Sequence, residues 1–397
     1  YRYADTKKIR NISVQMNIRR KMTSEERKEA RYKRRKGKRE RKRKSKLLSF
    51  EQVFSYENLY KAFIRCRRNV GWKASTQRYI VQAPLNVYKT KESLLNGKFK
   101  SKGFFEFSLY ERGKKRQIKS VKIEERIVQR CLCDHALVPT IERSFVYDNG
   151  ASIKNKGYHF AMNRMTRHLQ YNCRKYGTDG YILLFDFSKF FDNVPHDTIK
   201  EIVHKSFDDQ RIIDLTNHFI DCFGGDKGLG LGSQISQTLA LALCNKLDHL
   251  IKEELKVKCY GRYMDDGYLI HPDKDYLKYC LKRIKEECGK LGMPLNDKKT
   301  HIVKISHGFT WLKGRFYLTQ SGKIAKKIYK KSVTRERRKL KKLKKLCESG
   351  RMTEEDVWCA FQSWRSYASR FDAYHTIKNM EELYSSLFGR ERLCTKQ

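Results

Sequence analysis

The spacing of hydrophobic residues predicts a chain in which helices and short strands alternate. Strict alternation, which is typical of strands, predicts a basic hairpin over residues 103–123 that turns at 111–114, and a second hairpin over 260–271. Residues 181–187 (YILLFDF) predict an apolar strand interrupted by one acid. Apolar residues recur at helical spacing in six other stretches, namely 51–68, 124–137, 157–176, 195–222, 236–256 and 273–291.

The C-terminal part predicts a small helical bundle. Leucines and Cys347 fall on one face of a very basic helix over 334–347. Thr353 and Asp356 have the spacing of a capping box that begins a second helix. The residues expected to point inward from this second helix are Val357, Phe361 and Trp364.

The net charge of the chain indicates what kind of partner it binds. The chain has 397 residues, with 88 Lys and Arg against 44 Asp and Glu, so its formal net charge is +44. Such a surface repels itself unless a polyanion is present, which favours a nucleic-acid partner. The sequence shows no apolar run long enough for a membrane span and no secretory signal, and its twelve cysteines form no CxxC pair. We therefore expect reduced thiols, no membrane partner and a cytoplasmic location.

The N-terminal 46 residues form the most basic segment. They hold 21 Lys and Arg against 5 Asp and Glu, and residues 31–46 contain twelve basic residues in sixteen. This flexible arm, whose candidate nucleic-acid-binding residues include Lys33, Arg34 and Arg35, is expected to bind phosphates without sequence preference. A solubilising tail is the open alternative. Because the other residues keep a net charge of +28, the folded body is also expected to contact nucleic acid.

Candidate chemistry lies on two acidic segments. Asp186 interrupts an apolar strand, and Asp265 and Asp266 are adjacent at the tip of a predicted hairpin. Burying a carboxylate is costly, and neighbouring carboxylates raise each other's pKa. Mg²⁺ would compensate for this, because it prefers oxygen ligands and retains substrate phosphates. We therefore predict two Mg²⁺ ions, for which Mn²⁺ can substitute, that activate a 3′-hydroxyl and stabilise leaving pyrophosphate. An ordinary acidic turn is the alternative for an isolated Asp-Asp pair.

The motifs around these acids resemble those of reverse transcriptases. Residues 263–266 (YMDD) have the YxDD form of that family. Further motifs resemble the family's in the expected order along the chain, at residues 114–116, 125–129, 186–192, 228–237, 295–300 and 309–314. The resemblance implies an α+β right-hand polymerase fold, with fingers, a palm of antiparallel sheet plus helices, and a small helical thumb.

The same resemblance implies how the chain divides. After the arm at 1–46, residues 47–180 would form the fingers and the start of the palm. Residues 181–318 would form the palm with the catalytic carboxylates, and part of the fingers would be inserted near 195–235. Residues 319–397 would form the helical thumb.

The resemblance also assigns roles to residues. Asp186, Asp265 and Asp266 are the implied catalytic residues and, with the backbone carbonyl of Phe187, the implied metal ligands. Phe191 would exclude a ribose 2′-hydroxyl, although plain core packing also explains it. The implied nucleotide-binding residues are Lys114, Lys115, Arg116, Arg126, Phe191, Leu231, Gly232, Gln237 and Lys299. For the cations near residue 115, the alternative interpretation is an exposed hairpin face without a nucleotide-binding role. For Lys299, the alternative is an ordinary surface lysine.

Two further sets of residues would contact the template–primer duplex. Trp311, Leu312 and Gly314 resemble the primer grip. Arg337, Lys341 and Lys344 on the basic helix would follow the duplex as part of the thumb.

Within the family, Ser236 and Gln237 resemble the enzymes of diversity-generating retroelements, as do residues 141–148 and 156–159. That lineage implies a bacterial or phage-encoded enzyme that copies a template RNA into cDNA with errors at adenine. Its partners would be the template RNA, dNTPs and the RNA–DNA duplex, and a small basic accessory protein is left open. An antiphage-defence enzyme that makes cDNA from a noncoding RNA, and a catalytically silent RNA-binding protein, are the alternatives.

Overall fold

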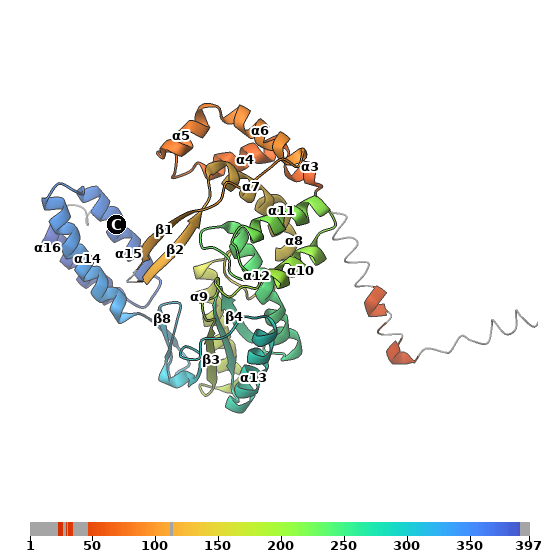
Figure 1. The fold of residues 1–397 in the computed structure, drawn as a ribbon. Helices are drawn as coiled ribbons and strands as arrows, with labels where there is room; N and C mark the ends of the chain where they lie inside the picture. The colour runs from red at the N-terminus through yellow and green to blue at the C-terminus, as the bar shows by residue number, and fades with distance from the viewer. Residues whose placement is uncertain (1–22, 27–28, 30, 35–46, 112–113, 390–397) are drawn as a thin grey trace, which may run out of the picture.

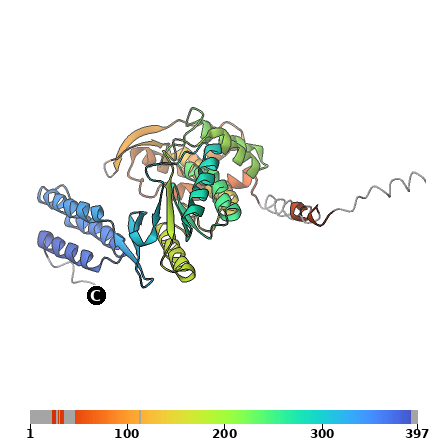
Figure 2. The same ribbon diagram turned by 90° about the horizontal axis from the view of Figure 1, so that it is seen from below.

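A computed structural model of the chain describes residues 23–26, 29, 31–34, 47–111 and 114–389. Helices mix with three antiparallel sheets of two, four and three strands, so the expected α+β class is confirmed. Figures 1 and 2 show the four-stranded sheet and its helices in the middle, with a projecting hairpin and a set of C-terminal helices around them. Within the described residues, no helix is both long and apolar enough to cross a membrane.

The four-stranded sheet has the order β4-β5-β3-β6 and is antiparallel at each pairing. The expected strand and hairpin are both confirmed within one or two residues. The bounds of the four strands are β3 Tyr181–Asp186, β4 Cys259–Tyr263, β5 Asp266–His271 and β6 His301–Lys304.

Strand β3 is buried on both faces, which explains the apolar run at residues 181–185 before Asp186. Leu183 and Phe185 join one hydrophobic core, and Ile182 and Leu184 join another on the opposite face. Helices α12 (Gln234–His249) and α13 (Lys274–Lys290) contribute to the first core, and α9 (Tyr158–Tyr176) to the second. The sheet is therefore held between two helical layers.

The N-terminal part is helical around a long hairpin. Strands β1 (Phe105–Glu111) and β2 (Lys114–Ser120) pair as expected, although residues 112 and 113 of their turn lie outside the described residues. Figure 1 shows this hairpin projecting away from the helices beside it. Those helices are α3 Phe50–Val53, α4 Tyr56–Cys66, α5 Ala74–Val81, α6 Ala83–Leu95 and α7 Ile123–Leu132. After α7 the chain continues as a turn of π-helix (Cys133–Leu137) and then as α8 (Val138–Ile141). The helical segment therefore extends beyond residue 137, where the sequence predicted its end.

Two predicted helical stretches are each divided in two. The stretch 51–68 breaks because the Ser55 side chain accepts a hydrogen bond from the backbone of Asn58 and begins α4. The stretch 195–222 forms α10 (His196–Ser206) and α11 (Gln210–Asp221), and Asp209 caps α11 in the same way. The Asp209 carboxylate also accepts a hydrogen bond from the backbone of Phe50, so this break fixes the N-terminal helices against α11. Helix α12 continues to residue 254 as a π-helical turn.

A three-stranded sheet leads into the C-terminal helices. Its strands are β7 Phe309–Trp311, β8 Gly314–Leu318 and β9 Ile324–Ile328, and the helices are α14 Lys330–Glu348, α15 Glu354–Ala368 and α16 Tyr374–Phe388. The capping box at Thr353 and Asp356 is confirmed, and α14–α16 enclose a core that includes Leu340, Phe361 and Tyr384. Both ribbon views show these helices standing apart from the central sheet.

Gly267 in β5 provides a test of how tightly the central sheet is packed. A Cβ at this position would lie 2.1 Å from Cζ of Phe185 in β3. We expect Gly267→Ala to lower the free energy of unfolding by about 1–3 kcal/mol, because the Phe185 ring has no free space to move into. Chemical denaturation measures the change. Gly289→Ala in α13 is the matched control, since nothing lies within 4 Å of its added Cβ and helical alanine should stabilise by about 0.5–1 kcal/mol. Equal effects of the two substitutions would contradict this packing.

Candidate active site

Strand pairing brings the three predicted carboxylates together at one end of the central sheet. Asp186 ends β3, and in the β3–β5 register it lies directly opposite Asp266, the first residue of β5. Asp265 precedes it in the two-residue connection between β4 and β5. The Asp186 residue is only 5% exposed.

This crowding changes the protonation of the site. Burial, followed by the charges of Asp265 and Asp186, raises the pKa of Asp266 to about 7. Burial also raises the pKa of Asp265, and the charge of Asp186 adds to the effect. The folded chain therefore holds these carboxylates at a free-energy cost, which a positive charge between them would relieve.

Lys299 supplies one such charge. Its Nζ lies 2.9 and 2.8 Å from the two carboxylate oxygens of Asp186. The chain positions it through Asn296, whose backbone nitrogen donates to the Asp186 carbonyl at 2.7 Å and whose carbonyl accepts from the Lys299 backbone at 3.0 Å. The pKa of Lys299 is raised, because its contacts with Asp186 outweigh the opposing effect of burial. Lys299 is thus part of the carboxylate cluster and not an ordinary surface lysine.

The donor set fits Mg²⁺ by its chemistry. Among the described residues, no group of three or more His, Cys, Asp or Glu side chains is arranged so that it could hold a metal ion by itself. Mg²⁺ commonly uses one or two carboxylates and completes its shell with water and substrate phosphates, so it does not need such a cage. The Phe187 backbone nitrogen donates to the Asp265 carbonyl at 3.3 Å, while the carbonyls of Asp186 and Pro294 accept the hydrogen bonds on either side. These bonds leave the Phe187 carbonyl out of the backbone ladder.

The hairpin contributes positive charge above the carboxylates. Lys115 and Arg116 are exposed on β2, and the charge of Arg116 offsets part of the rise in the pKa of Asp265 that burial causes. Of Lys114 only the backbone is described. Arg126 lies lower, where its Nη2 donates to Ser120 Oγ at 2.7 Å and its side chain lines a cavity of about 460 Å³ beneath the hairpin.

Gly232 lines the same cavity beneath the hairpin. Its φ of 110° favours glycine, and a Cβ would lie 3.4 Å from both Ile118 Cγ2 and the Lys119 carbonyl. The preceding Leu231 is held by its carbonyl, which accepts from the Lys119 backbone at 3.3 Å. Gln237 is farther along, where its Oε1 accepts from Ser152 Oγ at 3.1 Å.

The remaining aromatic predictions fall partly in the core. Phe191 is half-buried and packs edge-to-face on Phe190, with ring centroids 5.2 Å apart.

The three residues of the predicted primer grip lie where the three-stranded sheet begins. The Trp311 ring is buried against the Tyr268 ring, with ring centroids 4.8 Å apart, so its direct contribution to a primer grip would have to come from its backbone. Leu312 forms the adjoining turn with a φ of 45°, and its carbonyl accepts from the hydroxyl of Tyr158. Gly314 has no room for a side chain, since a Cβ would lie 2.8 Å from Phe371.

The residues predicted to contact nucleic-acid phosphates differ in their exposure to solvent. Arg337 and Lys341 are exposed on α14, whereas Lys344 is half-buried, 3.8 Å from Glu348 and over the Phe388 ring. Lys33 pairs with Glu29 at 2.7 Å on an exposed helical turn that also contains Arg34. Arg35 and most of the arm lie outside the described residues.

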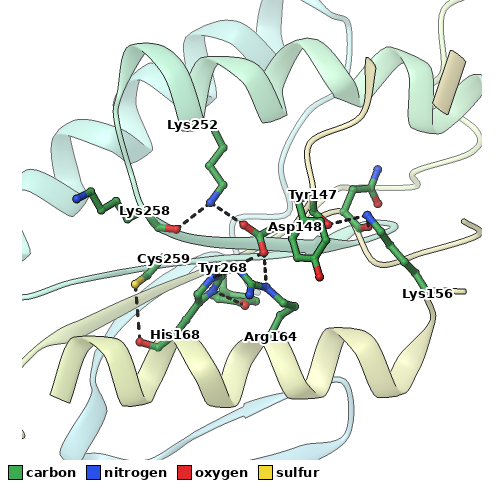
Figure 3. Close-up of polar contacts among 10 residues, drawn as sticks. Tyr147, Asp148, Lys156, Arg164, His168, Lys252, Lys258, Cys259 and Tyr268 are labelled. Carbon is green, nitrogen blue, oxygen red and sulfur yellow. Dashed lines mark hydrogen bonds and ion pairs between the residues drawn. The ribbon is translucent and has the colours of Figure 1, made fainter. Parts of the chain in front are cut away.

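Sequence analysis missed a buried ionic cluster beside the site (Figure 3). Asp148 accepts from Arg164 Nε at 2.5 Å and lies 2.7 Å from Lys252 Nζ. Burial alone would raise the pKa of Asp148, but these two cations lower it below its ordinary value. Burial lowers the pKa of His168 to about 4, and its neutral ring shares a 2.9 Å hydrogen bond with the Tyr268 hydroxyl. The cluster fixes the loop at 145–157 to the central sheet, and the resemblance of residues 141–148 to one lineage was its only sequence signal.

Comparisons with known proteins give one matching family and several similar solved structures. A family model described as reverse transcriptase (RNA-dependent DNA polymerase) matches residues 100–336. No curated protein sequence is significantly similar to the chain. The solved structures that it resembles include apo telomerase from Candida tropicalis truncated from its C-terminal domain, at 15% identity and a TM-score of 0.43, covering 56% of this chain and 55% of that one. Telomerase from Candida albicans in complex with a TWJ fragment of telomeric RNA has 12% identity and a TM-score of 0.47, covering 79% of this chain and 66% of that one. The chain thus spans 55% and 66% of the lengths of these two chains.

The raised pKa of Asp266 predicts that this residue destabilises the metal-free protein. The folded state holds the proton more tightly than the unfolded state, so stability falls as the pH rises toward about 7. Asp266→Asn removes the charge, and we expect it to raise the free energy of unfolding at pH 8 by on the order of 1–2 kcal/mol, with a smaller gain at pH 5. Thermal unfolding in EDTA at both pH values measures it. Asp192→Asn, at an exposed carboxylate, should change little, and a loss of stability in Asp266→Asn at pH 8 would contradict the crowding.

Proposed function

Because the chain belongs to the reverse transcriptase family, we propose that it synthesises DNA on an RNA template by metal-assisted nucleotidyl transfer. One observation carries the proposal: Asp186, Asp265 and Asp266 converge at the end of a buried sheet, with Asp266 at a pKa of about 7. A site that keeps this much acid together at a cost in stability is typical of one that receives cations with its substrate.

The carboxylates of Asp186, Asp265 and Asp266, with the carbonyl of Phe187, would hold two Mg²⁺ ions. When bound, the ions supply Lewis-acid activation of the primer 3′-hydroxyl and neutralise charge on the leaving pyrophosphate. Lys299 Nζ contacts both carboxylate oxygens of Asp186. Its half-exposed side chain can swing away from Asp186 toward solvent, where it would steady the pyrophosphate charge or protonate it.

Other residues would position the incoming dNTP. Lys114, Lys115 and Arg116 on β2 would meet the triphosphate from above, and Arg126 would reinforce them from the hairpin base. Phe191 would pack under the deoxyribose and exclude a 2′-hydroxyl. The close backbone approach at Gly232 suits a nascent base pair, with Leu231 and Gln237 beside it.

Substrate strands would follow the basic surfaces around the site. The proposed thumb, residues 319–397, would place Arg337 and Lys341 along the phosphates of the RNA–DNA duplex. The turn that includes Leu312 would support the primer, and the arm at 1–46 would add sequence-independent affinity for RNA. The proposed fingers and palm keep the boundaries of 47–180 and 181–318, with part of the fingers near 195–235.

Catalysis by the carboxylates can be tested with an RNA template, a DNA primer and dNTPs. We expect the combined Asp265→Ala and Asp266→Ala substitutions to reduce primer extension by at least about 1,000-fold, since the site then loses its main cation ligands. Binding of the template–primer should remain within about threefold, because phosphate contacts elsewhere supply most of the affinity. Asp179→Asn is the matched control, as Asp179 pairs with Lys304 on the surface, 3.1 Å away. Mg²⁺-dependent extension by the double variant would refute the assignment.

For the biological role we propose a diversity-generating retroelement, supported by Ser236 and Gln237 and by the ordered loop at 145–157. An antiphage-defence enzyme is the second candidate, because the basic arm is not part of the retroelement pattern. Sequencing the RNA and cDNA that co-purify with the protein from its host distinguishes them. The retroelement role predicts cDNA with changes opposite template adenines. Faithful or repetitive cDNA from one structured noncoding RNA would instead assign the chain to defence.

A further inference from the structure

Arg262 is an arginine with no exposure beside the proposed catalytic site. It lies in β4, and neither its side chain nor that of Asp248 in α12 is accessible to solvent. Two guanidinium nitrogens hold the carboxylate, with Nη2 2.6 Å from Oδ2 and Nε 2.8 Å from Oδ1. The Tyr260 hydroxyl also donates to Asp248. The pair is therefore rigid, since a forked ion pair fixes both partners in position and orientation.

The third guanidinium nitrogen reaches the catalytic turn. Arg262 Nη1 donates to the carbonyl of Met264 at 2.9 Å. The backbone of Arg262 is fixed as well, because its nitrogen donates to the Asp148 carbonyl at 3.2 Å and its carbonyl accepts from Gly150 at 2.9 Å. The loop stabilised by the ionic cluster of Figure 3 thus holds the strand from which the guanidinium extends.

The turn needs such support. Met264 and Asp265 form a two-residue connection, and Met264 has a φ of 55°. Tight hairpin turns usually place Gly or Asn at a position with positive φ, because other residues are strained there. Strained backbone persists where its surroundings fix it. Here the Met264 carbonyl is held by Arg262, and the Asp265 carbonyl by the Phe187 backbone, so both peptide planes of the turn are set.

We infer that Arg262, anchored by Asp248, is a positioning residue that holds the turn at 263–266 so that Asp265 and Asp266 face Asp186. The inference rests on the proposed function for its consequence in catalysis. Helix α12 follows Gly232 and carries Gln237, so the pair also ties the nucleotide-contacting segment to the metal-binding turn. Neither Arg262 nor Asp248 contacts substrate in this scheme.

A purely structural pair would behave differently from a positioning pair. Replacing both partners of a buried ion pair with apolar residues of similar size is often neutral for stability, whereas removing one partner leaves an uncompensated charge. The double variant Arg262→Met with Asp248→Leu therefore separates the two roles. It can keep the core packed, but it cannot donate a hydrogen bond to the Met264 carbonyl.

The experiment compares the full-length double variant with the wild type by thermal unfolding, by steady-state primer extension and by Mn²⁺ binding followed by electron paramagnetic resonance. We expect a melting temperature close to that of the wild type. We also expect kcat to fall, and Mn²⁺ affinity to weaken, by about 10- to 100-fold, as found when residues that orient metal ligands are lost. The KM for dNTP should stay within about twofold, because the triphosphate contacts are elsewhere. Wild-type kcat and Mn²⁺ affinity in the folded double variant would overturn the inference.

Two further variants complete the test. Tyr260→Phe is the matched control, since it removes a hydrogen bond to the same Asp248 without touching the turn, and it should keep kcat and Mn²⁺ affinity. If the double variant does not fold, Arg262→Lys replaces it, because a single ammonium cannot hold both carboxylate oxygens and the Met264 carbonyl. Full kcat and Mn²⁺ affinity in Arg262→Lys would equally overturn the inference. If the wild type makes no DNA, the proposed function fails, and Mn²⁺ binding alone still decides the role of Arg262.

Discussion

Pairing β3 with β5 so that Asp186 lies opposite Asp266 forces carboxylates together at the end of a buried sheet. The register cannot slip, because a shift of one residue would exchange the two faces of β3. Leu183 and Phe185 are packed in one core while Ile182 and Leu184 are packed in the other. Gly267 adds a local lock, since the Phe185 ring occupies the space that any side chain there would need. The apolar packing of the palm thus determines the position of the acids.

The electrostatics of the site follow from that constraint. A chain with a net charge of +44 gathers three carboxylates at the end of its central sheet, and Arg116 on the hairpin is close enough for its charge to act on Asp265. The positive surfaces attract a polyanion, and the acidic centre attracts the cations that accompany it. Residues that serve function in this way often reduce stability, and the raised pKa of Asp266 is the local sign of that conflict.

Features of the fold and of the candidate site could be predicted from the sequence where the residues that contact each other are close along the chain. The β4–β5 hairpin, the capping box at Thr353 and the apolar strand β3 rest on local patterns, and the structure confirms them. The contact between the Asp209 carboxylate and the backbone of Phe50 could not be predicted in the same way, because the two residues are 159 positions apart. Trp311 has the residue type and spacing of a surface motif, yet Tyr268 from another sheet covers it. The sequence does not show which carboxylate a buried arginine pairs with, so the ion pair between Arg262 and Asp248 could be identified only from the structure.

Lys299 and Arg262 contact different parts of the site, and they also differ in exposure. The Lys299 side chain is 54% exposed and contacts the oxygens of Asp186 directly, so it can leave them when another cation arrives. Arg262 is fully buried and contacts the backbone of the turn, so it stays in place through any such exchange. Under the proposed function, a site that admits and releases cations would need both kinds of charge. Lys299 would balance the carboxylates between substrates, and Arg262 would keep their geometry constant while that balance changes.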